Sequence, residues 1–263
     1  MNAWIEQDER NAVMTRTPCM QADEASSAVP ASPARRQGVR CSECVMRRLC
    51  MPSELGANDL ARLDALIATT RAVRRGETLF RSGDAFQSLY AVRSGSFKTV
   101  VVHRDGAEQV TGLHLPGDAL GLDGICNDQQ TCDAVALEDS SVCVIPFSLF
   151  ETLCHDIRPL QRHFYRIMGR ALARESNLLM LLGTMSAEQR VAAFLLNFSE
   201  RLRLRGYSPL TFCLRMTREE MGSFLGVKLE TVSRMFSKFQ RDGLLKIRGK
   251  SIQLLDLERL AQI

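Results

Sequence analysis

The stretch TREEMGSFLGVKLETVSRMFSKFQRDGLL, residues 217–245, has the layout of a helix-turn-helix. Its first four residues, TREE, form a capping box, in which the Thr and Glu side chains satisfy free amides at the start of a helix. That helix is expected from about Arg218 to Leu225. Gly226 then stands where the chain must turn sharply, and the small Gly222 stands where two helices would cross. The stretch therefore predicts two short helices packed across a tight turn.

The second helix of this pair carries the residues expected to read DNA. Val232 and Met235 would bury it against the first helix, and its outward face would present Glu230, Ser233, Arg234 and Lys238. Such a helix can enter the major groove, where Arg makes a bidentate contact to guanine and Glu accepts from cytosine. The segment GLLKIRGKSIQLL, residues 243–255, predicts a hairpin wing with basic side chains near phosphates: Lys246, Arg248 and Lys250. The alternative is a helical hairpin with a solvated charged face.

The charge distribution agrees with a nucleic-acid partner for this part of the chain. Residues 184–263 carry 14 Lys or Arg and 8 Asp or Glu, a net charge of +6, whereas the remaining 183 residues sum to −2. A basic part on a near-neutral body indicates an anionic partner, which the helix-turn-helix identifies as double-stranded DNA. The chain has 263 residues, of which 45% are hydrophobic and 24% charged, so it is long enough for two globular domains.

The expected compartment is the cytoplasm. No apolar run approaches the roughly 18 residues of a membrane span, and the polar N-terminus MNAWIEQDER does not resemble a secretory signal. Thiols stay reduced in the cytoplasm, so nine cysteines favour metal or redox chemistry over a disulfide framework.

The rest of the chain predicts a barrel flanked by helices. Short β-prone runs between Arg74 and Pro146 indicate an antiparallel barrel or sandwich. Asn58 is expected to cap a short helix before the barrel, and the capping box SLFE (148–151) is expected to open a helix after it.

A long helical stretch follows, opened by Asp156 and Pro159 and ending near Gly183, and SAEQ (186–189) caps the next helix. The sequence thus predicts an α+β chain in four parts: a disordered tail (1–39), a cysteine-bearing flap with the barrel (40–155), a long helix (156–183) and a helical DNA-binding domain (184–263).

Three cysteines in ten residues suggest a metal site. In CSECVMRRLC (41–50), Cys41, Cys44 and Cys50 have the spacing C-x2-C-x5-C, and a four-thiolate site needs one more ligand. Cys126, Cys132 and Cys143 are candidates for it. Four thiolates suit a [4Fe–4S] cluster; structural zinc sites usually pair two short knuckles, of which the chain has one. A thiol switch without metal is the third possibility.

Several segments resemble one family of regulators. LETVSRMFSKFQRDGLL (229–245) is similar to the recognition helix and wing of the cAMP receptor protein/FNR superfamily. CSECVMRRLC, LFRSGDAFQSLYAVRSGSFKTV (79–100) and SSVCVIPF (140–147) resemble its oxygen-sensing FNR (fumarate and nitrate reduction) branch. The similarity covers about residues 41–255. It implies an antiparallel, jelly-roll-like β-roll, a long dimerisation helix and a winged helix-turn-helix.

The resemblance also implies the ligands and partners. It selects Cys143, at the end of a barrel strand, as the fourth ligand of a [4Fe–4S] cluster beside Cys41, Cys44 and Cys50. The other cysteines are then expected to be free thiols: Cys19, Cys126, Cys132, Cys154 and Cys213. It implies a TTGAT-type inverted repeat as target and contact with RNA polymerase through barrel loops, for which residues 103–107 are a candidate.

Cyclic nucleotide binding is not expected. The cAMP-binding branch holds the ribose with Gly-Glu and the phosphate with Arg-Ser. Here Gly121 is followed by Leu122, and Thr131-Cys132 replaces Arg-Ser. A buried phosphate without an Arg is poorly compensated, so this loop is interpreted as a scaffold turn without a ligand.

The long helix contains a heptad spacing typical of a dimer seam: Phe164, Met168, Ala171, Glu175, Leu178 and Leu182. In a parallel symmetric dimer the two Glu175 side chains would face each other, and like charges oppose association. The alternative is a seam offset that leaves Glu175 at the rim. The family carries an Asp at this place.

Together these features predict an oxygen-responsive transcription regulator. The cluster is intact without oxygen, the long helices pair, and the homodimer binds its palindrome; oxygen breaks the cluster and the dimer. The rival hypothesis is a zinc- or thiol-based stress sensor with the same DNA-binding domain. An enzyme is disfavoured because the sequence shows no nucleophile–base pair and no phosphate loop.

Overall fold

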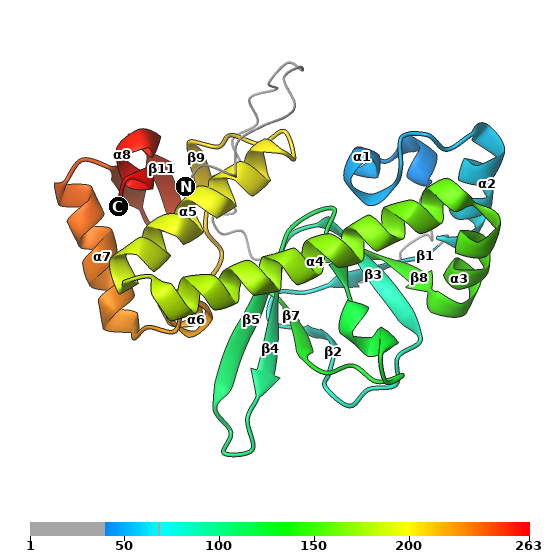
Figure 1. The fold of residues 1–263 in the computed structure, drawn as a ribbon, viewed down its shortest axis with the longest axis horizontal. Coiled ribbons are helices and arrows are strands. Elements are labelled where there is room, and N and C mark those ends of the chain that lie inside the picture. The colour runs from blue at the N-terminus through cyan, green and yellow to red at the C-terminus, as the bar shows by residue number, and fades with distance from the viewer. Residues whose placement is uncertain (1–39, 68) are drawn as a thin grey trace, which may run out of the picture.

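The computed structural model describes residues 40–67 and 69–263. The expected tail at residues 1–39, with Cys19, lies outside the described residues. The order of parts is the predicted one: the cysteine-bearing segment, a β-roll, a long helix and a helical C-terminal domain (Figure 1). The predicted α+β class, with a β-roll and a C-terminal helix-turn-helix, is confirmed.

Two four-stranded antiparallel sheets make up the β-roll. One contains β1 (Thr69–Val73), β8 (Ser140–Pro146), β3 (Ser88–Ser94) and β6 (Ala119–Leu120), in that order. The other contains β2 (Thr78–Phe80), β7 (Asp133–Ala136), β4 (Phe97–Val102) and β5 (Glu108–His114). A short 3-10 helix, η2 (Leu122–Ile125), follows β6. Successive residues of a strand face opposite sides, so Val142 lies in the core between the sheets while Cys143 lies in a second core outside them.

Helices and the cysteine-bearing segment form that second core. They are η1 (Cys41–Glu43), α1 (Arg47–Cys50), α2 (Ala57–Leu66) and α3 (Phe147–Asp156), joined by the first residues of α4. Two expected caps are wrong. Gly56 is the N-cap of α2, so Asn58 lies inside the helix. Helix α3 follows β8 directly with Pro146 as its N-cap, so Ser148 lies within its first turn and caps nothing.

Helix α4 (Arg158–Thr184) runs along the molecule, with the cysteine-bearing segment near one end and the DNA-binding domain near the other (Figure 1). Pro159 lies in its first turn, where the missing amide costs no hydrogen bond. Asp156, also expected to open this helix, instead ends α3, and Ile157 is the N-cap of α4. None of the helices in the described part of the chain combines the length and apolar character needed to cross a membrane.

The C-terminal domain comprises α5 (Ala187–Arg203), β9 (Thr211–Cys213), α6 (Arg218–Leu225), α7 (Leu229–Arg241), β10 (Leu245–Arg248), β11 (Ser251–Leu254) and α8 (Leu257–Ala261). The capping boxes predicted at Ser186 and Thr217 are both confirmed. The predicted wing hairpin is confirmed as β10–β11, and β9 adds a third strand to it.

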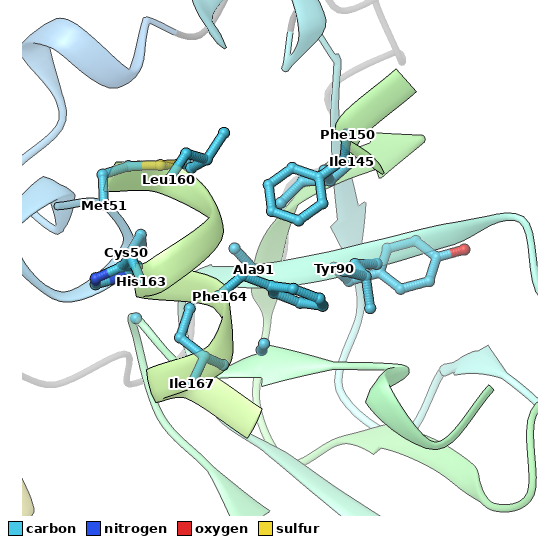
Figure 2. A pocket seen from close by; sticks show the side chains of 13 residues that line it. Cys50, Met51, Tyr90, Ala91, Ile145, Phe150, Leu160, His163, Phe164 and Ile167 are labelled. Atoms are coloured by element: carbon cyan, nitrogen blue, oxygen red, sulfur yellow. The ribbon is translucent and has the colours of Figure 1, made fainter. Parts of the chain in front are cut away.

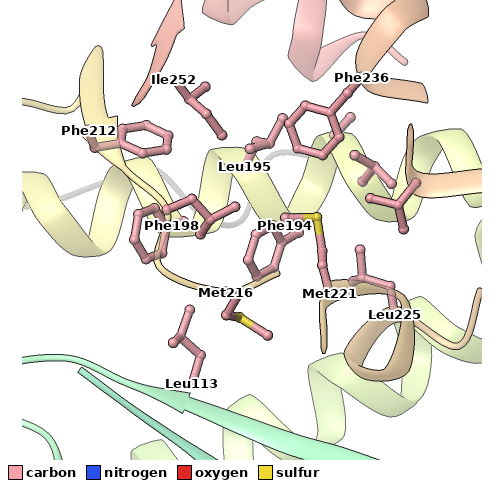
Figure 3. Packing of buried hydrophobic residues seen from close by; sticks show 14 of the residues in the cluster. Leu113, Phe194, Leu195, Phe198, Phe212, Met216, Met221, Leu225, Phe236 and Ile252 are labelled. Atoms are coloured by element: carbon pink, nitrogen blue, oxygen red, sulfur yellow. The ribbon is translucent and has the colours of Figure 1, made fainter. Parts of the chain in front are cut away.

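The core of this domain continues into the β-roll. Leu113 of β5 belongs to the same buried cluster as Phe194 and Phe198 of α5 (Figure 3). The two domains therefore pack against each other through a shared apolar interface.

Candidate functional site

The four cysteines singled out by the sequence lie in one region of the structure. Cys41 is in η1, Cys44 directly follows it, and Cys50 ends α1. Cys143 is the middle residue of β8, not the end of a strand as expected, and it pairs with Thr70 of β1 and Ala91 of β3. Cys41 and Cys143 are both buried in the core outside the sheets, with Cys50 packed against it.

The segment expected to be a flap is held down by Asp64 of α2. The Asp64 carboxylate accepts hydrogen bonds from the Cys41 amide at 2.5 Å, the Ser42 amide at 3.3 Å and the Ser42 hydroxyl at 2.7 Å. The sequence does not predict this anchor, because a single Asp on a short amphipathic helix gives no signal of its role.

The thiols of the four cysteines influence one another. Burial raises the pKa of Cys41 to about 12, and the nearby Cys143 adds to the rise. Burial also raises the pKa of Cys50 to about 12, with Cys44 and then Cys143 adding to it. Within residues 40–67 and 69–263, however, no three His, Cys, Asp or Glu side chains are arranged so as to hold a metal ion. The structure gathers the four sulfurs without bringing them into ligand geometry.

Of the remaining described cysteines, Cys154 of α3 belongs to the same buried core as Cys41 and Cys143, and the others lie outside it. Cys126 is exposed, Cys154 is buried, and Cys132 is buried between the sheets with its Sγ 3.6 Å from the Asp123 carboxylate. The expectation of a free thiol is wrong for Cys213, which is disulfide-bonded.

The recognition helix α7 presents part of the predicted set to solvent. Val232 is buried and Met235 is half-buried, which fixes the register of the helix as expected. Glu230 and Arg234 are exposed and Ser233 is half-exposed. The Arg234 guanidinium donates to the Thr231 hydroxyl at 3.2 Å, so its direction is partly set before any DNA arrives.

Two lysines predicted to contact DNA, Lys238 and Lys250, differ in whether another side chain of the protein already binds them. Lys238 is engaged within the protein, because its Nζ lies 2.7 Å from both carboxylate oxygens of Glu188 on α5. Lys250 is exposed at the tip of the β10–β11 wing, next to Gly249, which adopts a φ of 59°. Of these two, Lys250 is available for a phosphate without breaking an ion pair, and the other predicted wing residues, Lys246 and Arg248, are exposed as well.

Helix α4 leaves an apolar stripe exposed. The exposed residues are Tyr165 at 57%, Leu172 at 66% and Leu179 at 71%, seven positions apart. The expected seam residues Phe164, Ala171 and Leu178 lie one position earlier and are half-buried. Phe164 packs edge-on against Phe150 of α3, with ring centroids 5.2 Å apart.

The other expected seam positions, Met168, Glu175 and Leu182, complete a heptad spacing with the exposed stripe as well as with the half-buried set one position earlier. Glu175 is exposed, and Met168 and Leu182 are half-buried.

A small cavity of about 40 Å³ lies between Cys50 and α4 (Figure 2). His163 of α4 lines it beside Cys50 and is 8% exposed, and its Nε2 has no hydrogen-bond partner among the described residues. Burial lowers the pKa of His163, so the ring is neutral at pH 7. The sequence gives no signal for His163, because a His on the apolar face of a helix is more often a core residue.

The loop at the cyclic-nucleotide position is closed by an internal carboxylate. Asp123 Oδ2 accepts hydrogen bonds from the Thr131 amide and hydroxyl, both at 2.7 Å. The hydrogen-bond donors that Thr131 could offer to a phosphate are thus already bonded to a carboxylate of the protein itself.

A β-roll joined through a long helix to a winged helix-turn-helix defines a transcription regulator with a sensor domain and a DNA-binding domain. Comparison with known families agrees: residues 70–156 match the cyclic nucleotide-binding domain and residues 189–263 match the Crp-like helix-turn-helix domain.

Full-length relatives and a solved structure narrow the class. The transcriptional regulatory protein btr of Bordetella pertussis is 43% identical over 89% of this chain and 96% of its own. The fumarate and nitrate reduction regulatory protein of Escherichia coli is 39% identical over 86% and 90%. FixK2 from Bradyrhizobium japonicum has a TM-score of 0.68 and 29% identity, covering 74% of this chain and 96% of its own.

The chain belongs to the FNR branch of the cAMP receptor protein/FNR superfamily, as the sequence resemblance predicted. It is a DNA-binding transcription regulator and not an enzyme.

Proposed function

We propose that this protein is an oxygen-responsive transcription regulator of the cytoplasm, switched by a [4Fe–4S] cluster on Cys41, Cys44, Cys50 and Cys143. The observation that carries the proposal is the convergence of a C-x2-C-x5-C segment and one β-roll strand on a single buried core. Cluster binding would therefore join a segment of 10 residues to the sheet that supports α4.

The donor set fits an iron–sulfur cluster. Thiolate sulfurs are the ligands such clusters prefer, and four cysteines complete a [4Fe–4S] site. Bringing the sulfurs into ligand geometry requires a movement of the segment, since in the described residues they are gathered but not arranged for a metal. When bound, the cluster supplies reactivity toward oxygen, and the chain supplies the sulfur ligands and the Asp64 anchor.

Dimerisation is proposed along α4. The exposed stripe of Tyr165, Leu172 and Leu179 supplies one set of heptad positions, and Met168, Glu175 and Leu182 supply the other. Apolar side chains of this size, exposed at more than half of their surface, favour a partner helix. Glu175 in the same stripe opposes pairing and sets a threshold that the cluster-bound form must overcome.

The DNA contacts follow from the exposed face of α7 and from the wing. Arg234 is assigned to guanine, Glu230 to cytosine, Ser233 to a third base edge and Lys250 to a phosphate. Lys238 reaches DNA only if it leaves Glu188. The dimer would place two recognition helices on successive major grooves of a TTGAT-type inverted repeat.

RNA polymerase is proposed to contact the β4–β5 hairpin. Its tip at residues 103–107 projects from the β-roll (Figure 1). The tip is an ordered turn, with the His103 amide donating to the Ala107 carbonyl at 2.8 Å, and its side chains are exposed. No role for a cyclic nucleotide is proposed, because Asp123 already satisfies the donors at Thr131.

The test is the metal content of protein purified without oxygen. Iron, acid-labile sulfide and an oxygen-sensitive visible spectrum are expected, and Cys143→Ser should lose all three. Cys132→Ser is the matched control, because it is also a buried β-roll cysteine but faces the core between the sheets. A full content of iron and sulfide in Cys143→Ser would contradict the assignment of Cys143 as a ligand. Zinc in place of iron, or a metal-free protein that responds to thiol oxidation, would favour the rival stress sensor.

A further inference from the structure

One buried carboxylate joins the three parts of the molecule. Asp118 lies in the turn between β5 and β6, and its side chain is 8% exposed. Its Oδ2 is 2.6 Å from Arg201 and its Oδ1 is 2.8 Å from Arg205, both in the DNA-binding domain. Arg174 of α4 approaches the same carboxylate at 4.0 Å. The β-roll, the long helix and the DNA-binding domain thus meet at a single side chain.

The arginines also bind the backbone around this turn. Arg201 donates to the Leu113 carbonyl and Arg205 donates to the Pro116 carbonyl, each at 2.7 Å. Burial alone would raise the pKa of Asp118, but Arg201 and Arg205 outweigh it and hold the pKa at about 2. The carboxylate is therefore charged at any physiological pH, and removing it would leave two largely buried guanidinium groups without a counter-ion.

The other side of the turn touches the cysteine-bearing segment. Gly117 has a φ of 90°, and a methyl group on it would lie 2.7 Å from Cβ of Leu49. Leu49 precedes the proposed ligand Cys50, and Gly117 and Cys50 line the same 40 Å³ cavity (Figure 2). The backbone of the turn is bound to Val92 of β3, at 2.8 Å through Gly117 and 2.9 Å through Asp118. Because these hydrogen bonds tie the turn to β3, the turn is expected to move together with the sheet and not independently of it.

We propose that Asp118 is a positioning residue that couples the cysteine-bearing segment to the DNA-binding domain. A shift at Leu49 presses on Gly117, and the Asp118 carboxylate passes the displacement to Arg201 and Arg205 and hence to α5. This route reaches the recognition helix without passing through the pairing of α4. The inference rests on the proposed function only for the cause of the shift, which is gain or loss of the cluster.

The first experiment measures DNA affinity of the full chain by fluorescence anisotropy on a TTGAT-type palindromic duplex, before and after exposure to air. The wild type is expected to differ between the two states by about 5- to 150-fold, the usual range of coupling between sites. Asp118→Asn should keep iron, sulfide and the visible spectrum while the ratio falls clearly below that of the wild type, since only the route through the pairing of α4 then remains. Glu138→Gln is the matched control, because it removes another carboxylate that bridges to the DNA-binding domain, through Arg215 at 2.9 Å. That control should keep the wild-type ratio, since no contact links Glu138 to Leu49 in the described residues.

The second experiment does not depend on the cluster. Hydrogen–deuterium exchange of the purified protein should show faster exchange of the α5 amides in Leu49→Ala as well as in Asp118→Asn. Unchanged exchange along α5 in Leu49→Ala, or a wild-type affinity ratio in Asp118→Asn, would overturn the coupling. A wild type without iron and sulfide would instead overturn the proposed function, and the exchange measurement would still decide the role of Asp118.

Discussion

Gly222→Ala tests the helix-turn-helix at its tightest point. Gly222 is buried on α6, and a methyl group on it would lie 2.6 Å from the Val227 carbonyl oxygen and 3.4 Å from the Leu229 amide nitrogen. Both atoms are backbone of the turn that leads into α7, and the Val227 amide donates to the Gly222 carbonyl at 2.9 Å. No side chain can rotate away from the added methyl, so the turn itself must move.

The magnitude follows from comparison with a second glycine. Overpacking of this kind costs about 1–3 kcal/mol. Replacing a helical Gly by Ala gains about 1 kcal/mol of helix propensity, which offsets part of that cost. Gly169 of α4 is also helical, and a methyl there meets no atom within 4 Å. Gly169→Ala therefore gains propensity alone, and the two variants should differ by about 1–3 kcal/mol, the overpacking cost.

The assay is thermal unfolding of both variants beside the wild type, followed by anisotropy on the palindromic duplex. Gly222→Ala should melt below the wild type and lose specific DNA affinity, because moving the turn displaces α7. Gly169→Ala should melt at or above the wild type and bind DNA normally. If Gly222→Ala were as stable as Gly169→Ala and bound DNA equally well, the crossing of α6 and α7 described above would be incorrect.

Three further outcomes are expected. Arg234→Ala should relax the base preference at one position per half-site, a loss of about 1–3 kcal/mol of discrimination. Lys250→Ala should instead weaken binding to all DNA sequences alike and flatten the salt dependence of the affinity. An unchanged base preference of Arg234→Ala in a binding-site selection would contradict the register of α7. Glu175→Ala should dimerise in air, read by sedimentation beside the wild type at equal concentration, and two monomers would place Glu175 outside the seam. The Asp118 pKa of about 2 lies below the ordinary value of about 3.9, so the carboxylate contributes roughly 2 kcal/mol to the free energy of unfolding above pH 4, and this contribution is lost as the pH falls toward 2. Asp118→Asn should therefore remove that part of the acid-unfolding curve. An unchanged curve would show that the ion pairs do not stabilise the fold.

Local signals in the sequence predicted the DNA-binding domain well. The capping boxes at Ser186 and Thr217 and the turn at Gly226, with a φ of 62°, are each decided within a few residues. The same signal failed at Ser148, because β8 runs straight into α3 and the helix begins before the Ser-x-x-Glu pattern. Strand β9 was missed because its partner β11 lies about 40 residues further along the chain. Propensity cannot report a pairing that only the tertiary fold creates.

The choice among cysteines shows a second limit of the sequence. Spacing alone left Cys126, Cys132 and Cys143 open, and only the resemblance selected Cys143. The structure supplies the physical difference, since Cys132 faces the core between the sheets while Cys143 faces the core that contains Cys41. A one-residue change of strand register would exchange these faces, and no pattern in SSVCVIPF fixes that register by itself.

The exposed stripe of α4 shows why the phase of a heptad pattern has to be read from a structure, and why the prediction about Glu175 is the same for either phase. Two heptads fit the sequence, one through Phe164, Ala171 and Leu178 and one through the residues that follow each of them. The β-roll and α3 cover part of the first set, so the second set remains for a partner helix. Both heptads share the intervening positions Met168, Glu175 and Leu182. If α4 pairs as proposed, the charge at Glu175 therefore falls within the pairing face with either set, and the expected repulsion does not depend on the phase that the sequence left undecided.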